Sequence, residues 1–315
     1  MSTPVPASSS RTTSFSSAPV LLIGRSGQVA SALQALAPVL LPDRSLVAGG
    51  RPAIDLAAPS DELALQLEAM LDQLAPALVI NAAAYTAVDR AESEPELAHA
   101  VNAVGVGVLA QACAARDLPL MHLSTDYVFN GCGESPWRED DPTGPLGVYG
   151  ATKLAGEEAL RAAGGPHLLL RVSWVFGIQG SSFVRTMLRL GRDRPALSVV
   201  DDQIGGPTSA EAIARTLLHL AEPAIATGLP WGTYHYAGQH AVSWHDFAAA
   251  IFAEAVDLGL LERAPALSAI PSSAYPTPAA RPANSRLDGS RFEATFGLPL
   301  PNWHEDLRYC LKAWR

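Results

Sequence analysis

The stretch PVLLIGRSGQVASALQALA, residues 19–37, decides the fold class of this 315-residue chain. Val20 to Ile23 are all apolar and predict a short buried strand, and the residues after Gly27 repeat apolar side chains at helical spacing. A strand that passes through a glycine turn into a helix is the opening unit of a doubly wound α/β sheet. The backbone N–H groups of such a turn can hold a pyrophosphate, so the stretch also predicts a nucleotide site.

The same alternation of strand and helix continues to about residue 175. Apolar runs at 77–84, 119–126 and 167–177 predict further buried strands, and the segments between them have helical spacing. Strands that are apolar throughout indicate a parallel sheet covered on both faces. Beyond about residue 180 the rhythm loosens and proline becomes frequent. We therefore predict an α/β, Rossmann-like doubly wound sheet with a smaller C-terminal substrate-binding lobe.

Composition excludes several classes of partner. The formal net charge of -9 argues against nucleic acid, and we find no apolar run long enough to suggest a membrane span. Three cysteines without CxxC spacing fit a reducing compartment, so we expect a cytoplasmic protein. The Ser-, Thr- and Pro-rich residues 1–18 predict a disordered tail and lack the apolar core of a secretory signal.

The segment SLVAG, residues 45–49, predicts the second strand of the chain, and its end bears on cofactor choice. NAD sites often carry an acidic residue there for the ribose 2′-hydroxyl, but this chain reads AGGRP at 48–52. Gly49 and Gly50 leave space, and Arg51 offers a cation for a 2′-phosphate. We predict NADPH as the cofactor, with NADH use left open; the alternative is that Arg51 simply faces solvent.

A second set of residues suits proton transfer. Tyr149 and Lys153 stand four apart on a predicted helix, and Thr125 lies at the end of a predicted strand. Addition of a hydride to a ketone requires a proton for the developing alkoxide, which a tyrosine hydroxyl can supply. A nearby ammonium lowers the pKa of a tyrosine, and a threonine hydroxyl can orient the carbonyl. We predict Tyr149 as the acid, Lys153 as the group that tunes it and Thr125 as the group that orients the substrate.

With these motifs in order, the chain resembles the dTDP-4-dehydrorhamnose reductase family of extended short-chain dehydrogenases/reductases. The resemblance runs from about residue 19 to the end. It rests on GRSGQV, NAAAYTAVDRAESEP, STDYVFNG, PLGVYGATKLAGE, LRVSWVFG, DDQIGGPT, TYHYAG, AYPTPAARPANSRLD and LPNWHEDL. It implies an NADP(H)-binding domain at 19–175 and mainly a substrate-binding lobe at 176–315, with some segments returning to the main sheet.

The resemblance also implies roles for residues that bind the cofactor. In addition to Arg51, Tyr149 and Lys153, these are Gly24, Gly27, Gln28 and Val29 at the phosphates, Asp55 and Leu56 at the adenine, and Ala84, Tyr85 and Thr86 beside the nicotinamide half.

It implies a substrate site as well. Besides Thr125, the deoxysugar would meet Asp126 and Trp174, and the diphosphate or thymine would meet Arg281, Asn284 and Arg286. The implied reaction is NADPH-dependent reduction of the C4 ketone of dTDP-4-dehydro-6-deoxy-L-mannose to dTDP-L-rhamnose, for cell-envelope polysaccharide. The oligomeric state is left open, with a homodimer as the assembly considered.

Metal binding is not expected. His235, His240 and His245 are close in sequence but lack a companion ligand motif. Some relatives use a glutamate early in the first helix to bind magnesium between subunits. This chain has Ala32 there, although Glu211 occupies another proposed ligand position. We predict no metal requirement.

Two other functions stay open at this stage. One is reduction or epimerisation of another nucleotide-sugar, and a 4-epimerase would keep its cofactor bound and show no net oxidation. A non-catalytic subunit, like the regulatory subunit of methionine adenosyltransferase that resembles this family, would act by binding a partner. The set Thr125, Tyr149 and Lys153 favours catalysis.

Overall fold

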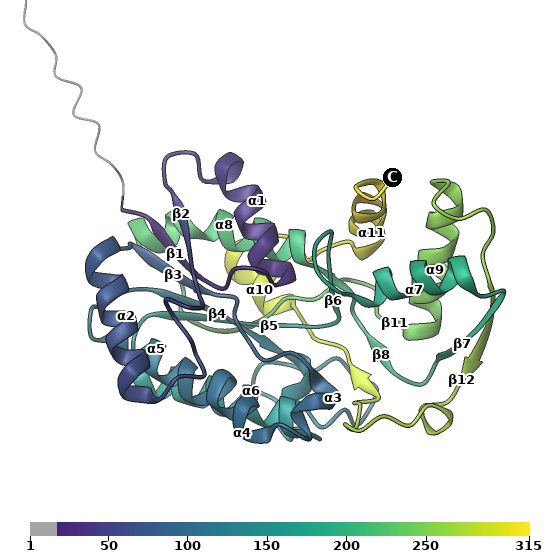
Figure 1. The fold of residues 1–315 in the computed structure, drawn as a ribbon, viewed down its shortest axis with the longest axis horizontal. Helices are drawn as coiled ribbons and strands as arrows, with labels where there is room; N and C mark the ends of the chain where they lie inside the picture. The colour runs from purple at the N-terminus through teal and green to yellow at the C-terminus, as the bar shows by residue number, and fades with distance from the viewer. Residues whose placement is uncertain (1–17) are drawn as a thin grey trace, which may run out of the picture.

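A six-stranded parallel sheet forms the centre of the molecule in the computed structural model, which describes residues 18–315 (Figure 1). All but the last residue of the predicted tail, 1–18, lies outside the described part. The strands in spatial order are β2 (Leu46–Gly49), β1 (Val20–Ile23), β3 (Leu78–Asn81), β4 (Leu120–Thr125), β5 (His167–Val172) and β10 (Gly232–His235). Every neighbouring pair is parallel, which confirms the predicted fold class.

Both faces of the sheet are covered, because successive side chains of a strand point to opposite faces. Val20 and Leu22 of β1 belong to one apolar core, whereas Leu21 and Ile23 belong to another. Figure 1 shows helices on both sides of the sheet. The first core is closed by α1 (Gln28–Leu40) and α8 (Ala210–Ala226), and the second by α2 (Ser60–Leu74), α5 (Gly105–Ala114) and α6 (Val148–Ala163).

One continuous helical segment, Pro95–Ala114, is long and apolar enough to cross a membrane by length and composition alone. The sequence-based view that no such run exists is therefore too strict. Half of its most apolar window is buried, and it packs on α2 and α6, as a core helix does. It consists of α4 (Pro95–His99), the π-helical turn η1 (Ala100–Val104) and α5.

A smaller lobe has its own apolar core, which includes Phe247 and Trp303. Its helices α7 (Phe183–Asp193) and α9 (Trp244–Asp257) lie beside the two-stranded sheet β7 (Ala196–Val200) and β12 (Ala266–Ile270) in Figure 1. The remaining elements are β6 (Val175–Phe176), β8 (Ile204–Gly205), β9 (Thr208–Ser209), β11 (Val242–Ser243), β13 (Asn284–Ser285), α3 (Val88–Ala91), η2 (Asp126–Val128), η3 (Ser272–Ala274), α10 (Ser290–Phe296) and α11 (Trp303–Lys312).

The strand order fixes where a ligand can bind. From β1 the chain goes to β2 on one side and then to β3 on the other, so the order reverses between β1 and β3. In open α/β sheets ligands bind outside the carboxyl ends of the strands at such a reversal. The glycine turn after β1 and the end of β4 both lie at this edge.

Candidate active site

The turn after β1 is open at the N-terminus of α1. Gly24 has φ 129°, in the region that favours glycine, and its N–H donates to the Gly49 carbonyl at 2.9 Å. A Cβ on Gly27 would meet nothing within 4 Å, and the first turn of α1 has no acidic residue. Unpaired N–H groups, the helix dipole and open space suit a bound diphosphate.

Gln28 supplies a second sign of a ligand. Its Nε2 donates to the Val175 carbonyl at 3.3 Å, but its buried Oε1 has no hydrogen-bond partner among the described residues. A buried acceptor without a donor costs free energy, so a bound molecule that donates a hydrogen bond to Gln28 Oε1 would stabilise the complex. Val29, in contrast, is buried in the first core and contributes packing.

A pair of arginines lies at the ends of β1 and β2. The guanidinium of Arg25 donates to the Arg51 carbonyl at 3.2 Å, and its side chain lies over Gly50. Both arginines are exposed. Only Arg51 was predicted from sequence as a contact to the cofactor. Arg25 lies in the GRSG motif, but the direction of its side chain depends on how β1 and β2 pair.

The residues expected at the adenine are tied into the fold. Asp55 accepts from the Ala57 N–H at 3.0 Å, and its own N–H donates to Gln66 at 2.9 Å. The Leu56 carbonyl lies where a Cβ on Gly105 of α5 would stand, so that glycine permits close packing.

The strip after β3 is held by Asn102, which the sequence analysis missed. The Asn102 amide accepts from the Tyr85 N–H at 2.8 Å and donates to the Tyr85 carbonyl at 3.0 Å and to Thr152 at 3.2 Å. The Tyr85 hydroxyl donates to Glu94 at 2.6 Å. Ala84 is partly buried and Thr86 is exposed. The sequence signal that could have identified Asn102 is a polar residue within an otherwise apolar predicted helix.

Thr125 and Asp126 form a buried pair at the end of β4. The Thr125 hydroxyl donates to Asp126 Oδ1 at 3.0 Å and accepts from the Tyr127 N–H at 3.2 Å. Asp126 Oδ2 has no hydrogen bond of normal geometry among the described residues, although the hydroxyls of Ser285 and Ser173 lie near the carboxylate. Burial raises the pKa of Asp126 to about 6, although hydroxyls of Ser285, Thr125 and Ser173 oppose the shift.

Tyr149 stands in the first turn of α6, and two contacts from elsewhere fix that turn. Gly147 caps the helix without a side chain, and the Glu92 carboxylate instead accepts from the Val148 N–H at 2.9 Å. Gly150 lies against the Tyr127 carbonyl, where a Cβ would come within 2.2 Å. The ring of Tyr149 meets that of Tyr127 edge to face at 5.5 Å.

The charges around Tyr149 differ from the sequence-based expectation. Burial raises the pKa of Tyr149 to about 12, while the Thr125 side chain lowers it. Lys153 is not among the groups that shift the pKa of Tyr149, and its ammonium group donates to the Leu123 carbonyl at 2.8 Å. Burial lowers the pKa of Lys153 to about 8, and Glu157 opposes that shift. Tyr149 is therefore protonated at neutral pH, and burial brings the pKa of Lys153 closer to neutrality than that of a free lysine.

Trp174 follows β5 with a strained backbone, at φ 47°. Its indole stacks on Trp244 with ring centroids 3.5 Å apart, and its other neighbour is Gly205, where a Cβ would come within 2.5 Å. Trp244 was missed in the sequence analysis, since only tertiary structure brings α9 to this position. The two indoles form an apolar wall beside the end of β5.

The predicted substrate-contacting residues in the proline-rich loop behave differently from one another. Asn284 is buried, and its amide donates to the Ser135 carbonyl at 2.8 Å and accepts from Arg286 at 3.0 Å. It holds Arg286 and has little capacity left for a ligand. Arg281 forms an ion pair with Asp89 at 2.8 Å, which ties the loop to α3.

The same loop reaches the end of the main sheet. β13 pairs in parallel with β8, and the Ser173 hydroxyl after β5 donates to the Ser285 carbonyl at 3.3 Å. The structure therefore brings Thr125, Asp126 and the segment around Arg286 to one edge, although they are up to 161 residues apart.

The histidines do not form a shared cluster. His235 is buried, and its pKa is lowered to about 3, first by burial and then by Arg171. His245 lies with Asp201 and Asp246, their ligand atoms within 4.8 Å of one another, in a group that includes exposed carboxylates. Glu211 is buried and accepts from the Ile178 N–H at 2.9 Å. Ala32 is buried in the first core. The absence of a metal requirement stays a prediction.

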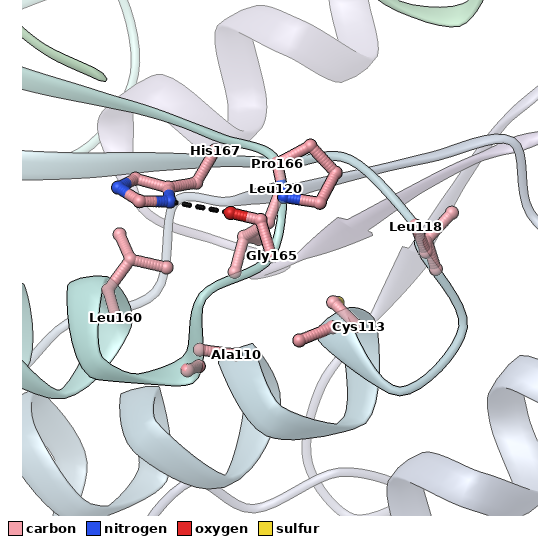
Figure 2. Close-up of a pocket in the computed structure, with 10 residues that line it drawn as sticks. Ala110, Cys113, Leu118, Leu120, Leu160, Gly165, Pro166 and His167 are labelled. Carbon is pink, nitrogen blue, oxygen red and sulfur yellow. Dashed lines mark hydrogen bonds between the residues drawn. The ribbon is translucent and has the colours of Figure 1, made fainter. Parts of the chain in front are cut away.

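An apolar recess lies at the opposite edge of the sheet (Figure 2). It is lined by Cys113, Leu120 and His167, where β4 and β5 begin, and the His167 ring bonds the Gly165 carbonyl at 2.8 Å. Burial raises the pKa of the Cys113 thiol to about 12. The lining of this recess is mostly apolar, and the recess lies at the amino ends of β4 and β5, away from the candidate active site.

Comparison with known proteins agrees with this geometry. The family model described as the RmlD substrate binding domain matches residues 18–315. The dTDP-4-dehydrorhamnose reductase of Salmonella typhimurium is 44% identical over 291 residues, covering 90% of this chain and 94% of that protein. That of Escherichia coli K12 is 42% identical over 293 residues, covering 93% and 96%.

A solved structure shows the same fold. The crystal structure of dTDP-4-dehydrorhamnose reductase from Bacillus anthracis in complex with NADP superimposes with a TM-score of 0.84 at 30% identity, covering 93% of this chain and 98% of that one. Family model, sequence identity and fold agree over nearly the whole described chain. The chain therefore belongs to the dTDP-4-dehydrorhamnose reductase family.

Proposed function

We propose that this chain reduces the C4 ketone of dTDP-4-dehydro-6-deoxy-L-mannose to dTDP-L-rhamnose with NADPH, in the synthesis of cell-envelope polysaccharide. The observation that carries the proposal is the contact between Tyr149 and Thr125 at the carboxyl edge of the sheet that also carries the open glycine turn, with Lys153 one helical turn beyond Tyr149 on α6. The catalytic groups are intact, which favours an enzyme over a regulatory subunit.

The residues present fit a dinucleotide. Gly24, Gly27 and the N-terminus of α1 would hold the diphosphate, and the buried Gln28 Oε1 offers an acceptor that lacks a donor. Arg25 and Arg51 would meet the 2′-phosphate, and the strip 84–86 would lie beside the nicotinamide half. Asp55 and Leu56 would border the adenine. When bound, NADPH supplies the hydride that C4 receives.

Proton delivery falls to Tyr149. The phenol is protonated at neutral pH, so it can donate a proton to the C4 oxygen as negative charge develops there. Thr125 would hydrogen-bond the same oxygen and fix its direction. Lys153 would stabilise the phenolate that forms and hold the ribose, because a cation beside a phenolate favours the charged form.

The substrate would lie between the main sheet and the smaller lobe. Asp126 would accept from a sugar hydroxyl through its unpaired Oδ2, and Trp174 would cover the apolar methyl edge. Arg286 and Arg281 would meet the diphosphate or thymine, since planar guanidinium groups suit phosphate oxygens. We propose a positioning role for Asn284, which holds Arg286.

This arrangement supports a cofactor domain at 19–175 and a substrate lobe drawn mainly from 176–315. β10 and α8 are exceptions, because they pack into the main sheet and its covering layer. All three cysteines are free thiols, in keeping with a cytoplasmic location. A homodimer stays the proposed assembly, and light scattering in solution would test it.

The decisive experiment mixes the purified protein with the 4-keto-L-sugar nucleotide and NADPH. We expect stoichiometric loss of reduced-cofactor absorbance and formation of dTDP-L-rhamnose. No loss with any dTDP-4-keto sugar would overturn the proposal. Purification with one bound nicotinamide per chain, and interconversion of sugars without net oxidation, would instead support a 4-epimerase.

A further inference from the structure

Lys153 is buried against β4, where two groups meet its Nζ atom. Nζ donates to the Leu123 carbonyl at 2.8 Å and lies 3.5 Å from Nε2 of His122. His122 is itself buried at the centre of the sheet, and burial holds its pKa well below the usual range, so the ring is neutral. The role of His122 therefore depends on which ring nitrogen carries the single proton.

Asn81 decides that question. Its Oδ1 accepts from the Ala83 N–H at 3.1 Å, which fixes the orientation of the amide. Its Nδ2 then faces Nδ1 of His122 at 3.0 Å. An amide NH₂ can only donate, so Nδ1 must carry the lone pair. The proton of the neutral ring is on Nε2, directed at Lys153.

This tautomer opposes a charged lysine. An ammonium group has no lone pair, so an Nε2–H beside it places two donors face to face, whereas a neutral amine can accept. The other charged groups act separately. Glu157 on α6 favours the ammonium but is paired with Arg171 of β5. Tyr149 on α6 and Asp126 after β4 interact with each other, and His167 of β5 acts on His122.

We propose that Asn81 and His122 are positioning residues for catalysis: they fix the imidazole as the Nε2–H tautomer and thereby ease proton loss from Lys153. The catalytic consequence rests on the proposed reductase function. Lys153 would then exchange protons close to neutral pH during turnover, instead of remaining a permanent cation. Burial alone lowers the pKa of a lysine. The Nε2–H tautomer of His122 lowers the pKa of Lys153 further, and one substitution can reverse this second effect.

That substitution is Asn81→Asp. A carboxylate keeps an acceptor for the Ala83 N–H but accepts from His122, so the proton moves to Nδ1 and the Nε2 lone pair accepts from the ammonium group. We expect the pKa of Lys153 to rise by about one unit. The chain has only two lysines, Lys153 and Lys312, so NMR titration of isotopically labelled lysine side chains resolves Lys153 directly. Exposed Lys312 is the internal control and should titrate unchanged.

Two measurements distinguish the effect of the His122 tautomer on the pKa of Lys153 from the direct charge effect of the new carboxylate. Neither of them depends on the proposed reaction. Nitrogen-15 NMR of the histidine rings should show Nε2–H for His122 in the wild type and Nδ1–H in Asn81→Asp. In a His122→Leu background, Asn81→Asp should raise the pKa of Lys153 much less, because only the direct attraction of the new carboxylate remains. A wild-type ring protonated on Nδ1, or a full shift without the imidazole, would overturn the inference.

These NMR measurements need no substrate, so they remain decisive even if the proposed reductase activity fails. In an active enzyme, we expect kcat to fall as Lys153 loses its proton, and this fall should begin at a higher pH in Asn81→Asp, while the Kd for NADPH at pH 7 stays within about twofold. An unmoved kcat profile despite a shifted lysine would show that Lys153 ionisation does not limit turnover, and would overturn the catalytic part.

Discussion

Glu157 and Arg171 form a buried, bidentate ion pair between α6 and β5. Arg171 Nε and Nη2 donate to the two carboxylate oxygens at 2.9 and 2.7 Å, and the side chains are 0% and 2% exposed. Arg161 bonds the same carboxylate at 2.6 Å, but its side chain is 40% exposed. The pair links α6, which carries Tyr149 and Lys153, to β5.

Replacement of the two arginines should therefore have very different costs. Arg171→Met leaves Glu157 buried and without its main partner, so we expect the free energy of unfolding to fall by about 3–5 kcal/mol. Arg161→Met removes a partly exposed partner and should cost about 0–1 kcal/mol. Urea unfolding of both variants measures the difference. Equal losses would show that Arg171 contributes no more than a surface pair.

His235 lies beside this ion pair and should make the fold sensitive to acid. Its Nδ1–H donates to the Trp137 carbonyl at 3.0 Å, and Nε2 faces Arg171 at 3.4 Å. Its pKa is lowered from 6.5 to about 3, so the unfolded chain takes up the proton first as the pH falls. His235 should thus reduce the free energy of unfolding by about 1.4 kcal/mol per pH unit below about pH 6.

The variant His235→Gln isolates this effect. Its free energy of unfolding should fall less steeply between pH 6 and pH 5 than that of the wild type, by about the same 1.4 kcal/mol per unit. His219→Gln, on an exposed position of α8, is the matched control and should keep the wild-type slope. Parallel slopes for His235→Gln and the wild type would contradict the assignment of His235 as a neutral buried ring.

The fold was accessible from sequence because its signals are local. The buried run Val20–Ile23, the glycine turn and the regular alternation after them each reflect residues adjacent in the chain. The contacts that orient the site are not local. Glu92 caps α6 from 56 residues away, Asn102 acts through a π-helical turn, and Trp244 reaches Trp174 only when the smaller lobe packs. In the sequence alone, nothing distinguishes Glu92, Asn102 or Trp244 from an ordinary residue of a helix.

Cofactor preference should depend on Arg25 as well as Arg51. Each guanidinium would make a charge-assisted bond to the 2′-phosphate, worth about 1–2 kcal/mol at an exposed site, so each alanine variant should raise KM for NADPH by about five- to thirtyfold. KM for NADH should change little. Arg44→Ala removes an arginine paired with Glu222 at the opposite edge and should leave both constants unchanged. An unaltered NADPH constant in Arg51→Ala would remove Arg51 from the site.

The proton donor is tested by Tyr149→Phe. Loss of the hydroxyl removes general acid catalysis, so kcat should fall by about 10²–10⁴-fold, while the Kd for NADPH, measured by fluorescence, should stay near the wild-type value. Tyr127→Phe is the matched control, because Tyr127 packs edge to face on Tyr149 without a proposed chemical role. It should keep turnover within about tenfold. Near-normal turnover in Tyr149→Phe would exclude Tyr149 as the donor, and the buried Asp126, whose pKa is raised to about 6, would become the acid to examine next.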